Sequence, residues 1–182
     1  MTTYIGLLRA VNLGAHNKIG MSELRDLLTG LGMGNVQTLL QSGNVVFQSD
    51  VRTTSEAERL IEIAAAQRLR LVTDVLVRSA KEWKGIIADN PFPKEAKQDP
   101  SHLLAVALKD VPTRSKIEAL QGAITGREIV SVHGRCAYIV YPDGIGRSRL
   151  TSALIEKRLA TRGTGRNWNT VLKLSALADA TR

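Results

Sequence analysis

Two runs rich in Val, Leu and Phe, separated by a short polar turn, constrain the fold of this chain most strongly. They occupy residues 36–49, and the turn between them is Gln41, Ser42, Gly43 and Asn44. Val and Phe favour a pleated, half-buried surface, whereas Gly and Asn tolerate the positive φ angles of tight turns. The segment therefore predicts a β-hairpin that displays polar groups at its tip. These residues do not indicate a particular chemical reaction.

The segments on either side of this hairpin predict the order β-α-β-β-α-β for the first half of the chain. Residues 4–11 form a short apolar run, and residues 21–31 place leucines on one face of a helix. Residues 54–65 predict a second amphipathic helix, and residues 71–77 predict another strand. This order is typical of the split βαβ, or ferredoxin-like, unit, with helices on one face of an antiparallel sheet.

A short helix at residues 79–89, stopped by two prolines in residues 90–93, ends the first subdomain, which we place at residues 1–93. Residues 94–100 are charged and poor in apolar side chains, which predicts a linker. The second subdomain then covers residues 101–182.

The second half repeats the element order of the first half only in part. The expected strands are residues 102–108, 128–133 and 136–141, and the expected helices are residues 113–120, 150–159 and 168–178. Residues 161–166 predict a loop, so a helix follows where a fourth strand is expected. The sequence therefore predicts an α+β fold made of a tandem pair of ferredoxin-like subdomains. Their antiparallel sheets carry helices on one face, and the second unit is modified with extra C-terminal helices.

The basic charge of the chain is concentrated near its C-terminal end. The net charge is +8 over 182 residues, and from Gly146 onward eight Lys and Arg residues face two acidic ones, which accounts for +6. This pattern indicates an anionic partner, either nucleic acid or a phosphorylated small molecule, although a solvated basic face gives the same statistics.

Cysteine usage and hydropathy indicate a reducing, cytoplasmic setting. Cys136 is the only cysteine, so neither an internal disulfide nor a Cys-based zinc site is expected. No leader is visible before residue 4, and no apolar run approaches the length that crosses a bilayer. The histidines lack metal-ligand spacing, so no metal site is expected, and the sequence leaves the cofactor unknown.

Four motifs resemble those of an uncharacterised bacterial family, the domain of unknown function (DUF) 1697. They are residues 7–14 (LLRAVNLG), 41–47 (QSGNVVF), 90–93 (NPFP) and 166–171 (RNWNTV), and they keep the order of the family. The resemblance implies a tandem pair of ferredoxin-like subdomains and no established activity, substrate or catalytic residue. The sequence departs from the family pattern at Ala15, where the family usually has glycine.

The first candidate ligand-binding group combines the loop after the first strand with the hairpin turn. Its members are Arg9, Asn12, Asn17, Lys18, Gln41, Ser42 and Asn44. In a simple split βαβ unit we expect the two segments at opposite ends of the sheet, so that one of them, preferably the loop, binds a polar or anionic ligand. The alternative is that Asn and Gly serve turn geometry and Ser42 bonds to the backbone.

Two further candidate groups lie in the basic C-terminal half. The Gly-rich segment with Gly146, Arg147, Ser148 and Arg149 follows a strand and opens a helix, which favours phosphate binding, or Ser148 simply caps that helix. The second group consists of Arg166, Asn167, Trp168, Asn169 and Thr170. Its arginine could pair with a phosphate, and its indole could stack on a base. The alternative is that Asn167 caps the helix and Trp168 anchors it in the core.

The leading hypothesis is that the basic C-terminal half binds an anionic ligand, either nucleic acid or a nucleotide. One alternative is an enzyme acting on a phosphorylated or nucleotide-like small molecule, whose catalytic residues the sequence does not identify. Another is a homodimeric interaction module that pairs through a free sheet face or edge. No membrane partner is expected.

Overall fold

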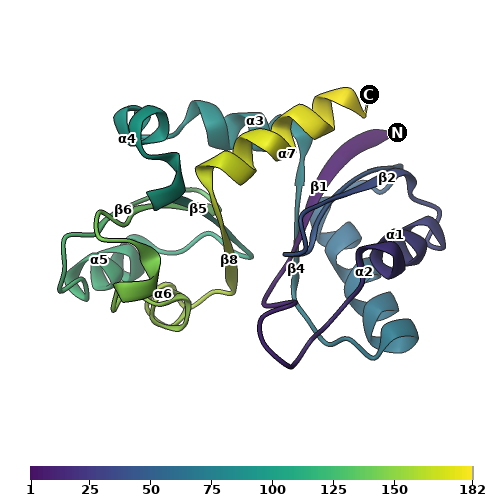
Figure 1. Ribbon diagram of the computed structural model, residues 1–182, viewed down its shortest axis with the longest axis horizontal. Coiled ribbons are helices and arrows are strands. Elements are labelled where there is room, and N and C mark those ends of the chain that lie inside the picture. The colour runs from purple at the N-terminus through teal and green to yellow at the C-terminus, as the bar shows by residue number, and fades with distance from the viewer. Residues whose placement is uncertain (182) are drawn as a thin grey trace. The chain divides into compact units, whose positions relative to one another are not determined.

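The computed structural model describes residues 1–181, which form two compact units. Unit 1 consists of Met1–Gly85 together with the chain from Lys173 onward, and unit 2 consists of Ile86–Leu172. Each unit is built on one four-stranded antiparallel sheet with helices, so the predicted α+β class is confirmed (Figure 1). Within residues 1–181, no helix is both long and apolar enough to cross a membrane.

Unit 1 is organised around its first strand, which lies inside the sheet. Its elements are β1 (Thr2–Leu8), α1 (Met21–Thr29), β2 (Gly34–Leu39), β3 (Asn44–Ser49), α2 (Thr54–Leu69) and β4 (Val75–Ser79), followed by α3 (Ala80–Ala88). The strand order is β2-β3-β1-β4, and every neighbouring pair is antiparallel. β1 ends at Leu8, so Arg9, which lies inside the apolar run predicted at residues 4–11, comes just after the observed strand.

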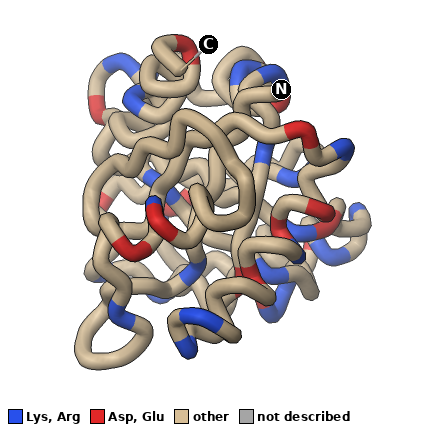
Figure 2. Tube along the Cα trace, turned by 90° about the vertical axis from the view of Figure 1, so that its right-hand side faces the viewer, with Lys and Arg blue, Asp and Glu red and all other residues tan. Residues whose placement is uncertain are grey.

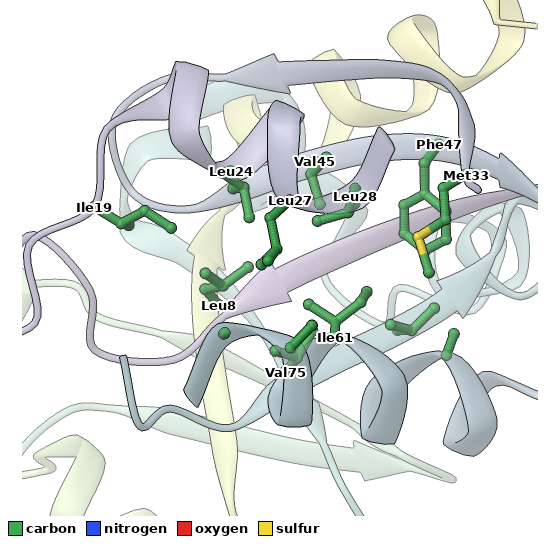
Figure 3. Close-up of a cluster of buried hydrophobic side chains, with 14 of the residues drawn as sticks. Leu8, Ile19, Leu24, Leu27, Leu28, Met33, Val45, Phe47, Ile61 and Val75 are labelled. Carbon is green, nitrogen blue, oxygen red and sulfur yellow. The ribbon is translucent and has the colours of Figure 1, made fainter. Parts of the chain in front are cut away.

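Helices α1 and α2 cover the same face of this sheet. Leu24 and Leu28 from α1 and Ile61 from α2 are fully buried and pack with strand residues such as Val45 and Phe47 (Figure 3). Burying a Leu, Ile or Phe side chain contributes roughly 1.5–3 kcal/mol. The apolar stripe that predicts α1 is therefore the stripe that holds this helix on the sheet.

Unit 2 contains a second sheet of the same strand order. Its elements are α4 (Pro93–Gln98), the 3-10 turn η1 (Pro100–His102), β5 (Leu103–Leu108), α5 (Arg114–Gly122), β6 (Ile129–His133), β7 (Cys136–Val140), the 3-10 turn η2 (Ile145–Arg147), α6 (Ser152–Leu159) and β8 (Gly163–Asn167). The order is β6-β7-β5-β8, again antiparallel throughout. Leu120 of α5 and Ile155 and Leu159 of α6 are buried in its core.

The predicted loop at residues 161–166 is wrong, because most of it is strand β8, paired with β5. Glycines conceal this strand in the sequence. A Cβ atom at Gly165 would lie 2.6 Å from Leu104 Cδ2, and one at Gly163 would lie 3.0 Å from Leu108 Cδ2. The side chains of Leu104 and Leu108 occupy the space that a Cβ atom would take at these positions, so glycine stands where the sequence pattern expects an apolar side chain. The second unit has its fourth strand, and α7 (Trp168–Ala180) is the one helix that follows it within the described residues.

The predicted linker at residues 94–100 also has regular structure. Pro93 occupies the first turn of α4, where a missing N–H costs nothing, and Pro100 opens η1. None of the α4 residues is buried, which explains why the segment lacks an apolar pattern in the sequence.

Two glutamates of α2 bond to the outer edge of β4. Glu58 Oε1 accepts from the Val77 N–H at 2.8 Å, and Glu62 Oε1 accepts from the Val75 N–H at 2.8 Å. The Arg78 guanidinium lies 3.8 Å from Glu58 Oε1, and both side chains are buried. Glu58 therefore satisfies a strand amide and a buried cation at once.

Replacing Glu58 should strongly destabilise unit 1. Glu58→Ala leaves the Arg78 charge and the Val77 N–H buried without this carboxylate, and we expect a loss of about 3–5 kcal/mol in the free energy of unfolding. Urea denaturation followed by circular dichroism measures it. The neighbouring exposed residue supplies the control, since Arg59→Ala should cost under about 0.5 kcal/mol. Equal effects of the two substitutions would refute the assigned role of Glu58.

Candidate functional site

The loop after β1 and the turn between β2 and β3 lie side by side at one end of the sheet of unit 1. The expectation that they lie at opposite ends is wrong, because β3 runs antiparallel to β1 and begins where β1 ends. Leu7 pairs with Asn44, and the Leu8 N–H donates to the Gly43 carbonyl at 2.8 Å.

The Asn12 side chain ties the loop to the turn. Its Nδ2 donates to the Gln41 carbonyl at 2.6 Å and to the Ile19 carbonyl at 3.1 Å, while its Oδ1 accepts from the Ile19 N–H at 2.9 Å. Asn12 also has a φ of 56°, a conformation that Asn tolerates better than most residues. Asn12 therefore shapes the loop.

The other members of this first group divide into bonded and exposed side chains. Arg9 lies 3.7 Å from Asp74, and the buried Asn44 donates to Ser42 Oγ and to the Leu39 carbonyl, each at 2.8 Å. Three members are exposed: Asn17, Lys18 and Gln41. The contacts of Asn12 and Asn44 support the turn-geometry interpretation of these two residues.

The group at the start of α7 is mostly internal. Trp168 is 3% exposed, and its ring centroid lies 6.5 Å from that of Tyr138. Asn167 Oδ1 accepts from the Thr170 N–H at 3.0 Å, which caps the helix; Asn169 is exposed. The buried indole has no face open for a base to stack on.

Arg166 is also buried within unit 2. Its Nη1 donates to Thr164 Oγ1 at 2.8 Å and to the Gly165 carbonyl at 2.9 Å. Burial lowers the pKa of Arg166 to about 10. Neither Arg166 nor Trp168 lines the hollow formed by the Gly-rich segment.

The Gly-rich segment lines a pocket of about 280 Å³ in unit 2, which we call the arginine pocket. Its walls come from the loop before β6 and from the segment after β7. The lining residues are Thr125, Gly126, Glu128, Asp143, Gly144, Arg147, Ser148 and Arg149. Gly146 is exposed and lies outside this lining. The pocket thus contains three of the four residues expected there.

The backbone of this segment differs from the predicted strand-to-helix turn. Gly144 leads into the 3-10 turn η2, and α6 begins only at Ser152. The helix cap is Thr151, whose Oγ1 accepts from the Leu154 N–H at 3.2 Å, so the predicted cap at Ser148 is wrong. The arginine pocket therefore relies on side-chain charge rather than on a helix N-terminus.

Both carboxylates of the pocket are engaged by other groups. Asp143 accepts from Arg127 Nε at 3.0 Å and from its Nη2, and this contact lowers the pKa of Asp143. Glu128 accepts from the Ser148 hydroxyl. Within residues 1–181, no hydrogen bond or ion pair is made by the side chain of Arg147 or Arg149. Both arginines are exposed, and acidic and basic positions are otherwise interspersed along the trace (Figure 2).

An Asp–His pair near the pocket is absent from the candidate groups predicted from the sequence, which places His102 at the start of the strand expected at residues 102–108. His102 Nδ1 lies 2.7 Å from Asp99 Oδ2. A carboxylate only accepts, so Nδ1 donates, and in the neutral form of the imidazole Nε2 is an acceptor. Nε2 would lie 3.6 Å from a Cβ atom at Gly144. The i, i+3 spacing of Asp99 and His102 was the available signal.

Comparisons with known proteins give one family match and a similarity in fold to a solved structure. The family model described as "Protein of unknown function (DUF1697)" matches residues 1–138. The conserved bacterial protein SP0830 from Streptococcus pneumoniae has a similar structure, with a TM-score of 0.77 over 97% of this chain and 98% of that chain, at 19% identity. No curated protein matches. Within residues 1–181, no group of three or more His, Cys, Asp or Glu side chains is arranged to hold a metal ion.

Asn12→Ala should destabilise unit 1, because it removes one hydrogen bond from the loop to the turn and two hydrogen bonds within the loop. We expect a loss of about 2 kcal/mol in the free energy of unfolding, measured by urea denaturation. Gln41→Ala is the matched control, since it removes an exposed side chain and keeps the carbonyl that Asn12 binds. A loss for Asn12→Ala no larger than for the control would contradict this role.

The phenol of Tyr141 should make stability fall at high pH. Burial, with a smaller contribution from the charge of Glu128, raises the pKa of Tyr141 to about 12. The folded state therefore keeps a proton that the unfolded chain loses near pH 10. This stabilisation is complete below pH 10 and is lost as the pH rises to about 12. Urea denaturation should show a shallower decline over this window for Tyr141→Phe than for the unmodified chain; parallel declines would exclude the shift.

Proposed function

Because the chain belongs to the DUF1697 family of proteins of unknown function, we propose from its own geometry that unit 2 binds a small anionic ligand in the arginine pocket. The observation that supports this proposal is that the two carboxylates of the pocket have hydrogen-bond partners, whereas the side chains of Arg147 and Arg149 make no hydrogen bond within the described residues. Arg127 and Ser148 hydrogen-bond to the two carboxylates. Arg147 acts on Asp143 only through its charge, and the guanidinium groups of Arg147 and Arg149 suit a phosphate or carboxylate group.

A nucleotide-sized or smaller ligand fits this pocket better than an extended nucleic acid strand. Single-stranded nucleic acid is usually held by exposed aromatic rings, and Trp168 is buried. The pocket volume of about 280 Å³ is at the lower end of small-molecule sites. Thr125, Gly126 and Gly144 also line the pocket, with no bulky apolar side chain among them.

We also infer that each unit is a ferredoxin-like domain and that the two form a tandem repeat. Both have the order β-α-β-β-α-β, and equivalent contacts recur in both. The bond from the Leu8 N–H to the Gly43 carbonyl corresponds to that from the Leu108 N–H to the Arg135 carbonyl at 2.9 Å. The Glu62–Val75 contact corresponds to Glu156 Oε1 accepting from the Gly163 N–H at 3.0 Å.

A second candidate function, catalysis on the bound anion, is favoured by the Asp99–His102 pair. His102 Nε2 points to the Gly144 segment that lines the arginine pocket, and an oriented imidazole is the commonest general base in enzymes. If this pair acts as a base, phosphate release from p-nitrophenyl phosphate should fall at least about a hundredfold in His102→Gln. No release from that compound by the unmodified chain would argue for binding alone.

Calorimetric titration with inorganic phosphate and with AMP tests the proposed binding. The double variant Arg147→Gln/Arg149→Gln should weaken binding at least about tenfold, because two charge-assisted contacts are lost. The matched control is Lys157→Gln/Arg162→Gln, which removes the same charge from a separate hollow of unit 2. Equal losses in both double variants would mean unspecific attraction to a basic protein, and an absence of saturable binding by the unmodified chain would remove the proposal.

A further inference from the structure

The outer edges of both sheets differ in how they are protected from pairing with another chain. On β4, Glu58 and Glu62 cover alternate outward amides, and on β8, Glu156 covers the amide of Gly163. Carboxylates at these positions block the groups that an added strand would need. The other two edges, β2 and β6, have no such carboxylate within the described residues.

β6 is the more receptive of the two remaining edges. β2 has a register shift between Gly34 and Gln37, and such a bulge twists an edge away from new partners. β6 keeps an unbroken register with β7 from Ile129 to His133. Its sequence, IVSVH, is mostly β-branched and contains no Lys, Arg, Asp, Glu or Pro, which are the usual guards of an exposed edge.

The backbone groups of β6 that point away from β7 belong to Val130 and Val132. His133 and Cys136 flank a two-residue turn and form a hydrogen-bonded pair, so alternate residues of β6 direct their N–H and C=O groups away from β7. The Val130 carbonyl accepts from Gln121 Nε2 at 3.3 Å, which agrees with this direction. Within residues 1–181, the Val130 N–H and both backbone groups of Val132 have no hydrogen-bond partner.

The arginine pocket lies at the end of the sheet where β6 begins. Thr125, Gly126 and Glu128 of its lining come directly before Ile129, and Asp143 and Gly144 follow the neighbouring strand β7. A strand added antiparallel to β6 would run toward this end and would finish beside Arg147 and Arg149. The C-terminus of a peptide carries a carboxylate, and two arginines can bind a carboxylate with charge-assisted hydrogen bonds.

We propose that β6 receives an extended peptide as a fifth, antiparallel strand, with the terminal carboxylate of that peptide bound in the arginine pocket. The proposal rests on the proposed anion binding and specifies the ligand as a protein C-terminus. The Val130 N–H and both backbone groups of Val132 supply the strand hydrogen bonds, and Arg147 and Arg149 fix the register.

Charge favours such a peptide over a second copy of this chain. Each copy carries a net charge of +8, so two copies repel one another. A two-fold pairing of β6 strands centred on Ser131 would also bring Arg127 of one copy toward the end where Arg135 of the other lies, whereas a carboxylate terminus complements the basic pocket.

The test uses the full chain and a pool of randomised heptapeptides, prepared once with free C-terminal carboxylates and once as C-terminal amides. Captured peptides are identified by mass spectrometry. We expect the free-acid pool to be enriched at least about tenfold over the amide pool, and Arg147→Gln/Arg149→Gln to abolish this difference. Equal capture of both pools would overturn the assignment of the carboxylate to the pocket.

The edge contact is tested separately on the best captured peptide. Val132→Pro removes an outward N–H and should weaken binding at least about tenfold. Because this variant can also disturb folding, peptides with single N-methylated amides are measured against the unmodified chain, and methylation at alternate positions should have the same effect. Insensitivity to every methylation would overturn strand addition.

Two outcomes separate this inference from the proposed function. If inorganic phosphate binds in an Arg147- and Arg149-dependent manner but no peptide is captured, the peptide proposal falls and anion binding stands. If light scattering shows a dimer that Val132→Pro dissolves and no peptide is captured, the edge serves a second copy, and the proposal is overturned.

Discussion

Antiparallel pairing of one inner strand with two neighbours is the constraint on which each unit depends. In unit 1, β1 pairs with β3 and β4, so the loop after β1, the β2–β3 turn and the approach to β4 all meet at one end of the sheet. The contacts there follow directly: Leu8 to Gly43, and the Arg9 N–H to the Asp74 carbonyl at 2.9 Å. In unit 2, β5 creates the same convergence.

The fold could be predicted from the sequence wherever side chains alternate or form a helical stripe. The stripe of Leu24, Leu27 and Leu28 marked α1, and the Gly134–Arg135 turn marked the β6–β7 hairpin. β8 could not be found in this way, because Gly163 and Gly165 face crowded neighbours and offer no apolar signal. Helix α4 buries none of its residues, so no hydrophobic period exposes it.

The candidate site was predictable in its residue types and less so in its geometry. Arginines near glycines after β7 indicated an anion site, and Arg147 and Arg149 do line a pocket. Arg166 and Trp168 have the same chemistry, but burial decides their role, and burial depends on which face of β8 and α7 is covered. The Asp99–His102 contact required a 3-10 turn that the sequence pattern does not reveal.

Helix α7 has a consequence for how the chain acquires its structure. It begins in unit 2, but from Lys173 onward it belongs to unit 1, where Thr181 receives hydrogen bonds from Gln37 and Gln48. Unit 2 is one continuous stretch of chain, whereas unit 1 is closed by residues synthesised after all of unit 2. During translation the four strands of unit 1 leave the ribosome first. The part of α7 that completes unit 1 is synthesised only after all of unit 2.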